Sequence, residues 1–320
     1  MKRIFTGILA GILAVLLTAG VCAATPETLI PGGNAVGLHL QTDGVTIVDF
    51  SNELPKKAGL QTGDRISAVN GTAVNSAEQL SETVSNCNGT PLKLTILREN
   101  DQRTITLSPT QTAHGWRLGL YVRDSVNGIG TVTYYNTQNH TFGALGHGVN
   151  DGKTLLPIRS GSALPTQVAS VCRGKKGTPG ALQGVLNGRS VCGTIEKNTS
   201  RGIFGTTSTV PTENKPLPVA ASSEIHTGKA TILSNVRGTA VEEFDIEIRA
   251  CYPNDAHDRN LLLEVKDADL LEQTGGIVQG MSGSPILQDG KLIGAVTHVL
   301  IDDPTQGYGI FIENMLNAAA

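Results

Sequence analysis

Apolar and polar residues alternate along many short segments of this chain, which is the pattern of half-buried β-strands. The alternation is clear at residues 92–97, 103–107, 118–122 and 244–248. In the last segment Phe244, Ile246 and Ile248 share one face, and acidic residues occupy the other. From about residue 115 onward the strands are short and separated by turns, which predicts an antiparallel sandwich or barrel.

Helical periodicity is weak by comparison. One helix is predicted from Ser76 to Ser85, because Leu80 and Val84 fall on one face. A second short helix is predicted at the end, from Glu313 to Ala320. The chain is therefore expected to be mainly β.

A hairpin is predicted near the C-terminus. Pro285-Ile286-Leu287 forms a short strand, and Asp289-Gly290 is a turn signal between two apolar runs. Residues 292–300 then form an almost continuous apolar strand, as expected for a strand buried in a barrel.

Composition narrows the class of protein. At 320 residues the chain has room for two domains, and its 38 glycines favour tight turns. The formal net charge of −3 gives no reason to expect nucleic acid as a partner. The cysteines and histidines lack the spacing of a zinc site, so we expect no metal and no cofactor.

Residues 1–24 form a targeting segment. Lys2 and Arg3 precede an apolar run from Ile4 to Leu17, and small residues follow through Ala24. This pattern predicts either a secretory signal cleaved after Ala23 or Ala24, or an uncleaved membrane anchor. Either way the rest of the chain is expected to be exported. Cys22 follows Val21 where a lipoprotein signal needs a small residue, so lipidation is not expected.

An exported protein can form disulfides. Four cysteines lie beyond the targeting segment: Cys87, Cys172, Cys192 and Cys251. Cys172 and Cys192 both occur in strand-like contexts, so a bridge between them is the first choice. Sequence does not determine connectivity, and free thiols remain the alternative.

Residues from about 29 to 112 form one compositional unit. One run in this unit resembles the PDZ family. It is Ala58-Gly59-Leu60-Gln61-Thr62-Gly63-Asp64-Arg65-Ile66, followed by Ser67-Ala68-Val69-Asn70-Gly71. The resemblance implies that an early loop, here Val36, Gly37 and Leu38, binds the C-terminal carboxylate of a peptide through backbone amides. The following strand would pair with the peptide by β-augmentation. The alternative is a groove that is closed or filled by the protein's own chain.

The segment Gly280-Met281-Ser282-Gly283-Ser284-Pro285 suits an exposed catalytic hydroxyl. Its glycines permit a tight turn close to a substrate carbonyl. The amides of Gly280 and Ser282 can face one point, where an oxyanion develops during acyl transfer. The segment resembles the nucleophile loop of trypsin-like serine proteases, with Met281 and Ser284 as departures. The plainer interpretation is a glycine-rich turn without catalytic function.

A serine nucleophile needs a base, and usually a group that orients the base. Of seven histidines, His147 lies in a turn framed by glycines, upstream of Ser282 in the same region. His298, on the strand after the nucleophile, is placed to line the pocket wall. The carboxylates available as a third group are Asp151, Asp245, Asp267 and Asp269. A Ser–His dyad remains open.

A closer resemblance covers nearly the whole chain. Four segments resemble the SpoIVB peptidase family, whose members are stage IV sporulation proteins. They are Thr274-Gly275-Gly276-Ile277-Val278-Gln279, the segments GALGHG and GTIEKNTSRGIFG, and residues 290–316. The resemblance implies an N-terminal PDZ domain followed by a trypsin-like double β-barrel serine peptidase domain at residues 113–320. It makes Ser282 the nucleophile, His147 the base and Asp267 the acidic partner.

The same resemblance implies a function and a place. The family acts between the forespore and mother-cell membranes, where it cleaves itself and a membrane-bound regulator. That cleavage leads to activation of a mother-cell sigma factor. Protein or peptide substrates are therefore the expected partners, with membrane contact through an uncleaved N-terminal segment. The rival hypothesis is a non-catalytic PDZ-containing regulatory or scaffold protein on a protease fold.

Overall fold

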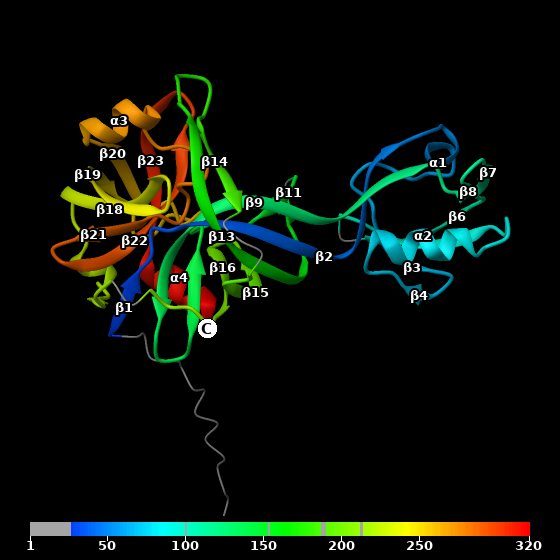
Figure 1. Cartoon of the computed structure of the whole chain (residues 1–320), viewed down its shortest axis with the longest axis horizontal. Coiled ribbons are helices and arrows are strands. Elements are labelled where there is room, and N and C mark those ends of the chain that lie inside the picture. The colour runs from blue at the N-terminus through cyan, green and yellow to red at the C-terminus, as the bar shows by residue number, and fades with distance from the viewer. Residues whose placement is uncertain (1–26, 100, 153, 187–189, 212–213) are drawn as a thin grey trace, which may run out of the picture.

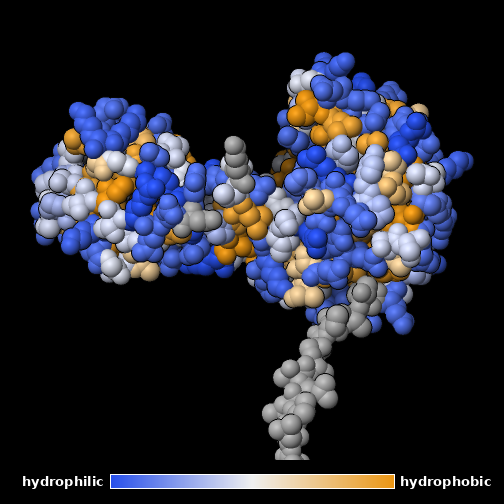
Figure 2. All heavy atoms as spheres, turned by 180° about the vertical axis from the view of Figure 1, so that it is seen from behind, coloured by the Kyte–Doolittle hydropathy of each residue, from blue (hydrophilic) through white to orange (hydrophobic). Residues whose placement is uncertain are grey.

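The computed structural model describes residues 27–99, 101–152, 154–186, 190–211 and 214–320. The predicted targeting segment, residues 1–24, lies outside this range. Figure 1 shows two bodies joined by a ribbon of two long strands, β2 (Ala35–Phe50) and β9 (Leu120–Asn136). Figure 2 shows the same two bodies from behind, with a narrow neck between them. Within the described residues, no helix has the length and apolar character needed to cross a membrane.

The smaller body contains the predicted PDZ unit. Its elements are α1 (Leu54–Lys57), β3 (Arg65–Val69), β4 (Thr72–Ala73), α2 (Ala77–Ser85), β5 (Leu92–Arg98), β6 (Asp101–Leu107), β7 (Thr110–Thr112) and β8 (Gly115–Arg117). The predicted helix is confirmed: the side chain of Ser76 caps α2 by accepting from the amide of Gln79, and Leu80 and Val84 are buried. They face a core that includes Ile66 and Ile96.

The larger body begins with a ring of strands. Its order is β2, β9, β10 (Thr141–Ala144), β16 (Gly202–Thr207), β15 (Gly193–Thr199) and β13 (Ile158–Cys172), and β13 pairs back with β2. Two short strands attach to it: β1 (Thr28–Pro31) pairs with β9, and β17 (Leu217–Pro218) pairs with β1. The strands β11 (Asn150–Asp151) and β12 (Thr154–Leu155) form a separate two-stranded sheet. A further strand, β14 (Ala181–Leu186), extends β13 as a hairpin. The ring encloses one apolar core, in which Leu40, Ile195 and Ile203 are fully buried.

The second barrel is closed by six strands in the order β18 (Gly228–Arg237), β19 (Ala240–Cys251), β20 (Leu261–Val265), β23 (Asp303–Phe311), β22 (Lys291–Leu300) and β21 (Pro285–Gln288). The remaining elements are η1 (Ser222–Glu224), α3 (Ala268–Thr274) and α4 (Ile312–Ala319). The predicted hairpin is β21–β22, and Asp289 and Gly290 both have positive φ at its turn. The mainly β fold and the short C-terminal helix are confirmed.

The chain passes between the two bodies twice. Residues 28–31 and 35–41 lie in strands of the first barrel sheet, although they precede the PDZ core in sequence. The PDZ fold is therefore inserted in the hairpin that connects β2 to β9. A single boundary near residue 112 does not describe this arrangement, because β9 leaves the PDZ body and enters the barrel without a break.

The predicted Cys172–Cys192 disulfide is wrong. All four described cysteines are free thiols. The thiol of Cys192 donates to the carbonyl of Ala163, which is nine residues from Cys172 along β13. Nine residues of extended strand span roughly 30 Å. A disulfide requires Cα atoms within about 7 Å of each other.

Candidate active site

The serine loop depends on two glycines with left-handed backbone. Gly280 and Gly283 have φ of 99° and 97°. A Cβ atom on Gly283 would lie 2.0 Å from the carbonyl oxygen of Thr131, so only glycine fits there. This close approach places the loop between the two barrels.

Two amides of the loop point to no protein acceptor. The amides of Met281, Gly283 and Ser284 donate to the carbonyls of Val278, Val296 and Met281, respectively. Among the described residues, the amides of Gly280 and Ser282 have no hydrogen-bond acceptor. They are the two amides that sequence predicted for an oxyanion hole. Free donors beside a nucleophile are what that role requires.

Ser282 and Ser284 have different environments. The hydroxyl of Ser282 is half-buried and donates to the carbonyl of Thr297 at 2.8 Å. Ser284 is fully buried, and its hydroxyl donates to that of Ser234 at 3.1 Å. Only Ser282 is placed to reach a substrate.

His147 follows β10 in a strained turn. Leu145 and Gly146 have φ of 70° and 68°, and such a value is costly for a leucine. A Cβ atom on Gly146 would lie 3.0 Å from the methyl group of Thr297, so the turn rests directly on β22. The turn that carries His147 and the hydroxyl of Ser282 therefore both lie against Thr297 of β22.

The imidazole of His147 has a defined tautomer. Its Nδ1 lies 2.9 Å from the carbonyl oxygen of Gly148. A carbonyl can only accept, so Nδ1 carries the hydrogen and Nε2 keeps its lone pair. Burial lowers the pKa of His147, and the bond to Gly148 opposes this effect only partly. The neutral ring can therefore act as a base through Nε2.

Thr131, in β9, holds both loops. Its amide donates to the carbonyl of Ser282 at 2.9 Å, and its carbonyl accepts from the amide of Leu145 at 3.2 Å. Its hydroxyl donates to the carbonyl of Gly280 at 2.7 Å. The sequence analysis missed this residue, because a threonine in a predicted strand carries no distinguishing signal.

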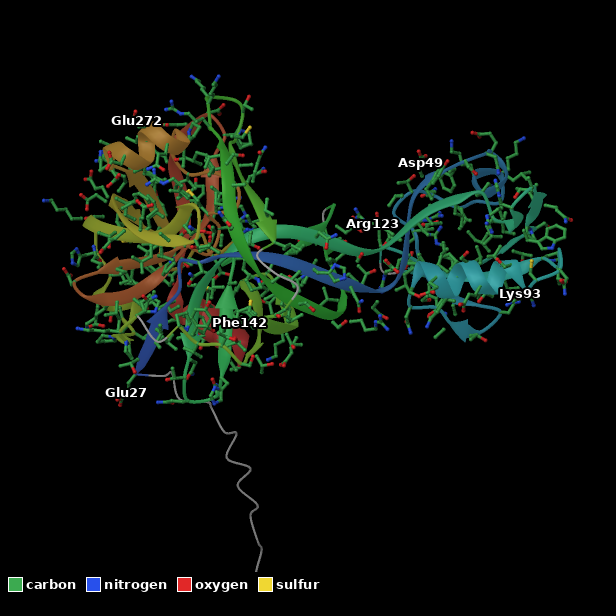
Figure 3. The ribbon with its side chains drawn as sticks, viewed as in Figure 1. Glu27, Asp49, Lys93, Arg123, Phe142 and Glu272 are labelled. Carbon is green, nitrogen blue, oxygen red and sulfur yellow. The ribbon has the colours of Figure 1, made fainter. Side chains whose placement is uncertain are left out.

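Asp267 is placed as a helix cap. One carboxylate oxygen accepts from the amide of Leu270 at 2.9 Å, and the other lies 3.4 Å from the amide of Asp245. In Figure 3, Glu272 marks α3 at the outer side of the second barrel. No hydrogen bond joins Asp267 to His147 among the residues described. Its assignment as the acidic partner stays a prediction.

Two other candidate carboxylates, Asp151 and Asp245, lie in different environments. Asp151 forms an ion pair with Arg123, which Figure 3 shows on the ribbon between the bodies. Asp245 is exposed on the outer face of β19, as predicted. The loop between β15 and β16 passes beside His147, since a Cβ atom on Gly148 would lie 2.5 Å from the carbonyl of Thr199. That loop consists of Ser200 and Arg201 and offers no carboxylate.

The predicted PDZ peptide-binding residues are wrong. Gly37 pairs with Ile129 on one side and with Leu164 on the other, and Val36 and Leu38 are paired in the same way. Both edges of this part of β2 are therefore occupied, and no peptide can add there. The error arose because the start of β2 precedes the PDZ core in sequence but belongs to the barrel in space.

The groove of the PDZ body lies elsewhere. A cavity of about 390 Å³ separates α2 from the start of β9. Its lining residues are Ser51, Ala77, Leu80, Ser81, Val84, Arg117, Leu118, Gly119, Leu120, Tyr121 and Val122. Residues 120–122 of β9 pair with β2 along one edge only in the described chain, so the other edge can accept a strand. Asp124 of β9 also accepts from the amide of Ala77, which ties the strand to the start of α2.

Comparison with known proteins agrees with a PDZ domain followed by a peptidase domain. The description "SpoIVB peptidase S55" belongs to the family model that matches residues 114–316, and a PDZ domain model matches residues 35–108. The fold and the loop around Ser282 define a serine peptidase that carries a PDZ domain. The chain belongs to the SpoIVB peptidase S55 family.

Three solved structures show limited similarity to parts of the chain. The PDZ domain of an SdrC-like protein from Listeria monocytogenes is 19% identical, with a TM-score of 0.23, covering 25% of this chain and 87% of that one. An inactive form of the Rv3671c protease is 14% identical, with a TM-score of 0.35, covering 60% and 84%. An inactive serine-to-alanine variant of Rv3671c from Mycobacterium tuberculosis is 14% identical, with a TM-score of 0.34. The match covers 60% of this chain and 82% of that one. No curated protein matches the chain.

Proposed function

We propose that this PDZ-containing serine peptidase is an exported endopeptidase that uses Ser282 and His147. The observation that carries the proposal is the serine loop itself. Two free amides flank a half-buried hydroxyl, and the same residue of β22 touches that loop and the His147 turn. No cofactor takes part in this chemistry.

The reaction begins when the hydroxyl of Ser282 turns from the carbonyl of Thr297 toward Nε2 of His147. His147 accepts the hydroxyl proton while the serine oxygen attacks the scissile carbonyl. The amides of Gly280 and Ser282 stabilise the tetrahedral oxyanion. His147 then gives the proton to the leaving amine, and water hydrolyses the acyl-enzyme with the same histidine as base.

The biological substrate that we propose follows from membership of the family. The protein would cleave itself and a membrane-bound regulator in the space between forespore and mother-cell membranes. That cleavage would lead to activation of a mother-cell sigma factor. The groove between α2 and β9 would hold a peptide terminus or an internal strand of the target through β-augmentation. Residues 1–24, if retained, would keep the enzyme at the membrane.

A scaffold protein without catalysis is the second candidate function. One experiment tests self-cleavage and also separates a peptidase from a scaffold. Active protein is mixed with a tagged Ser282→Ala copy, which serves only as substrate. We expect the tagged copy to be cleaved by the active protein and to remain intact alone. Intact tagged copy in the presence of active protein would contradict self-cleavage. Failure of the active protein to hydrolyse any peptide as well would favour the scaffold.

A further inference from the structure

Two consecutive residues of β22 contact the two reacting residues. The carbonyl of Thr297 accepts the hydroxyl hydrogen of Ser282 at 2.8 Å. The ring of His298 lies against the ring of His147, with centroids 4.9 Å apart and planes tilted by 38°. The side chain of His298 is exposed, whereas residues 292–296 of β22 are apolar and buried.

A catalytic histidine needs support for two purposes. Its ring must be fixed in orientation, and the positive charge that it acquires must be tolerated. Here the carbonyl of Gly148 fixes the tautomer. Among the described residues, no carboxylate is hydrogen-bonded to the imidazole. The ring of His298 packs against it at a tilt, and no other aromatic ring among the described residues does so.

The groups around His298 keep it neutral. Partial desolvation, the neighbouring His147 and the guanidinium of Arg259 together lower the pKa of His298 to about 4, although part of its side chain is exposed to solvent. Arg259 comes from the loop between β19 and β20, and it lies over the ring of Tyr308, the partner of His298 in the β22–β23 register. At neutral pH a neutral imidazole therefore faces the one that becomes charged during catalysis. A second charge at that point would oppose proton transfer.

We propose that His298 is a positioning residue for His147, whose neutral ring packs on the catalytic imidazole and holds it toward Ser282. This inference rests on the proposed function, since it assumes that His147 is the base. The proposal gives His298 a role in positioning the base, where the sequence alone suggested a residue of the pocket wall. The support comes from ring packing, so an aromatic replacement should substitute for the histidine.

The experiment compares three variants of the full chain: His298→Ala, His298→Phe and His298→Asp. The control is His226→Ala. His226 is an exposed histidine, and its ring pairs with the carboxylate of Asp289. The readouts are the rate of labelling by a small fluorophosphonate across pH, and kcat and KM for a short peptide. The small probe occupies little of the substrate pocket, so its rate reports the nucleophile and base.

We expect His298→Ala to lower the labelling rate and kcat by at least about tenfold, with KM nearly unchanged. His298→Phe should stay within about threefold of wild type, because the ring contact is kept. In His298→Asp the carboxylate should raise the pKa of His147, so the acid limb of the labelling profile should move to higher pH. His226→Ala should change nothing.

An unchanged labelling rate in His298→Ala, with a change in KM alone, would show a pocket wall and overturn the proposal. Loss of activity in His298→Phe equal to that in His298→Ala, with both proteins folded by circular dichroism, would also overturn it. If wild type itself is not labelled, the proposed function fails first and takes this inference with it. Normal labelling of wild type and of all three variants would remove this inference alone.

Discussion

The hydroxyl of Thr131 donates a hydrogen bond to the carbonyl of Gly280 at 2.7 Å, joining positions 149 residues apart. We expect Thr131→Val to keep the shape of the side chain but to leave that buried carbonyl without its partner. The cost should be about 1–3 kcal/mol of stability, together with a lower kcat, because the oxyanion loop is less firmly placed. Thermal unfolding and peptide hydrolysis measure the two effects.

Thr133 provides a matched control on the same strand. Its hydroxyl is buried and has no hydrogen-bond partner in the described structure. Thr133→Val should therefore leave activity unchanged and leave stability equal or slightly higher. Equal effects of the two substitutions would show that Thr131 acts by packing and not through its bond to Gly280.

The pH dependence should reflect the lowered pKa of His147. The base works only when neutral, so activity is lost as pH falls through its pKa. Because burial lowers that pKa, the acid limb of kcat/KM should lie below the ordinary histidine value of about 6.5. A profile of kcat/KM from pH 4 to 8 measures this. A limb centred above 6.5 would conflict with the neutral, buried imidazole in this site.

Asp267→Asn separates a helix cap from a catalytic acid. Asparagine caps helices as well as aspartate does, so the stability of the protein should be nearly unchanged. If Asp267 orients the imidazole of His147, as the family resemblance implies, turnover should fall by a large factor; a cap alone would leave turnover within about threefold of wild type. Asp267→Ala should instead lose about 1 kcal/mol of stability. A loss of several powers of ten in kcat for Asp267→Asn would support the sequence-based assignment.

The PDZ groove can be blocked without touching the barrels. Ser81 is exposed on α2 and lines the cavity, so Ser81→Trp should fill it. We expect weaker cleavage of a membrane-anchored target and an unchanged rate on a short soluble peptide. Glu82→Trp, on the same helix but outside the cavity, is the control. If both tryptophan variants cleave the anchored target normally, the groove takes no part in docking.

Local patterns predicted much of the fold. The Leu80 and Val84 spacing gave α2, and Asp289-Gly290 with the apolar runs around it gave the β21–β22 hairpin. These signals depend on neighbouring residues, so sequence carries them directly. The cap of α3 also had a signal that went unused, an aspartate immediately before a short run of helix-forming residues.

Contacts between segments that are distant in the chain could not be predicted from the sequence. Ala35 pairs with Thr131, and the whole PDZ body lies between them in the chain. The peptide groove was misplaced for this reason, and Thr131 was missed for the same reason. The contact between His147, in the turn after β10, and His298, in strand β22, likewise joins two barrels, and no spacing in the sequence reports it.

Labelling by a fluorophosphonate tests the central claim most directly, because the reagent reacts only with an activated serine. We predict that mass spectrometry of the purified protein will find one adduct, on Ser282, and that Ser282→Ala and His147→Ala will each abolish it. Ser284→Ala should still be labelled on Ser282. An adduct on another serine, or undiminished labelling of Ser282 in His147→Ala, would contradict the assignment of nucleophile and base.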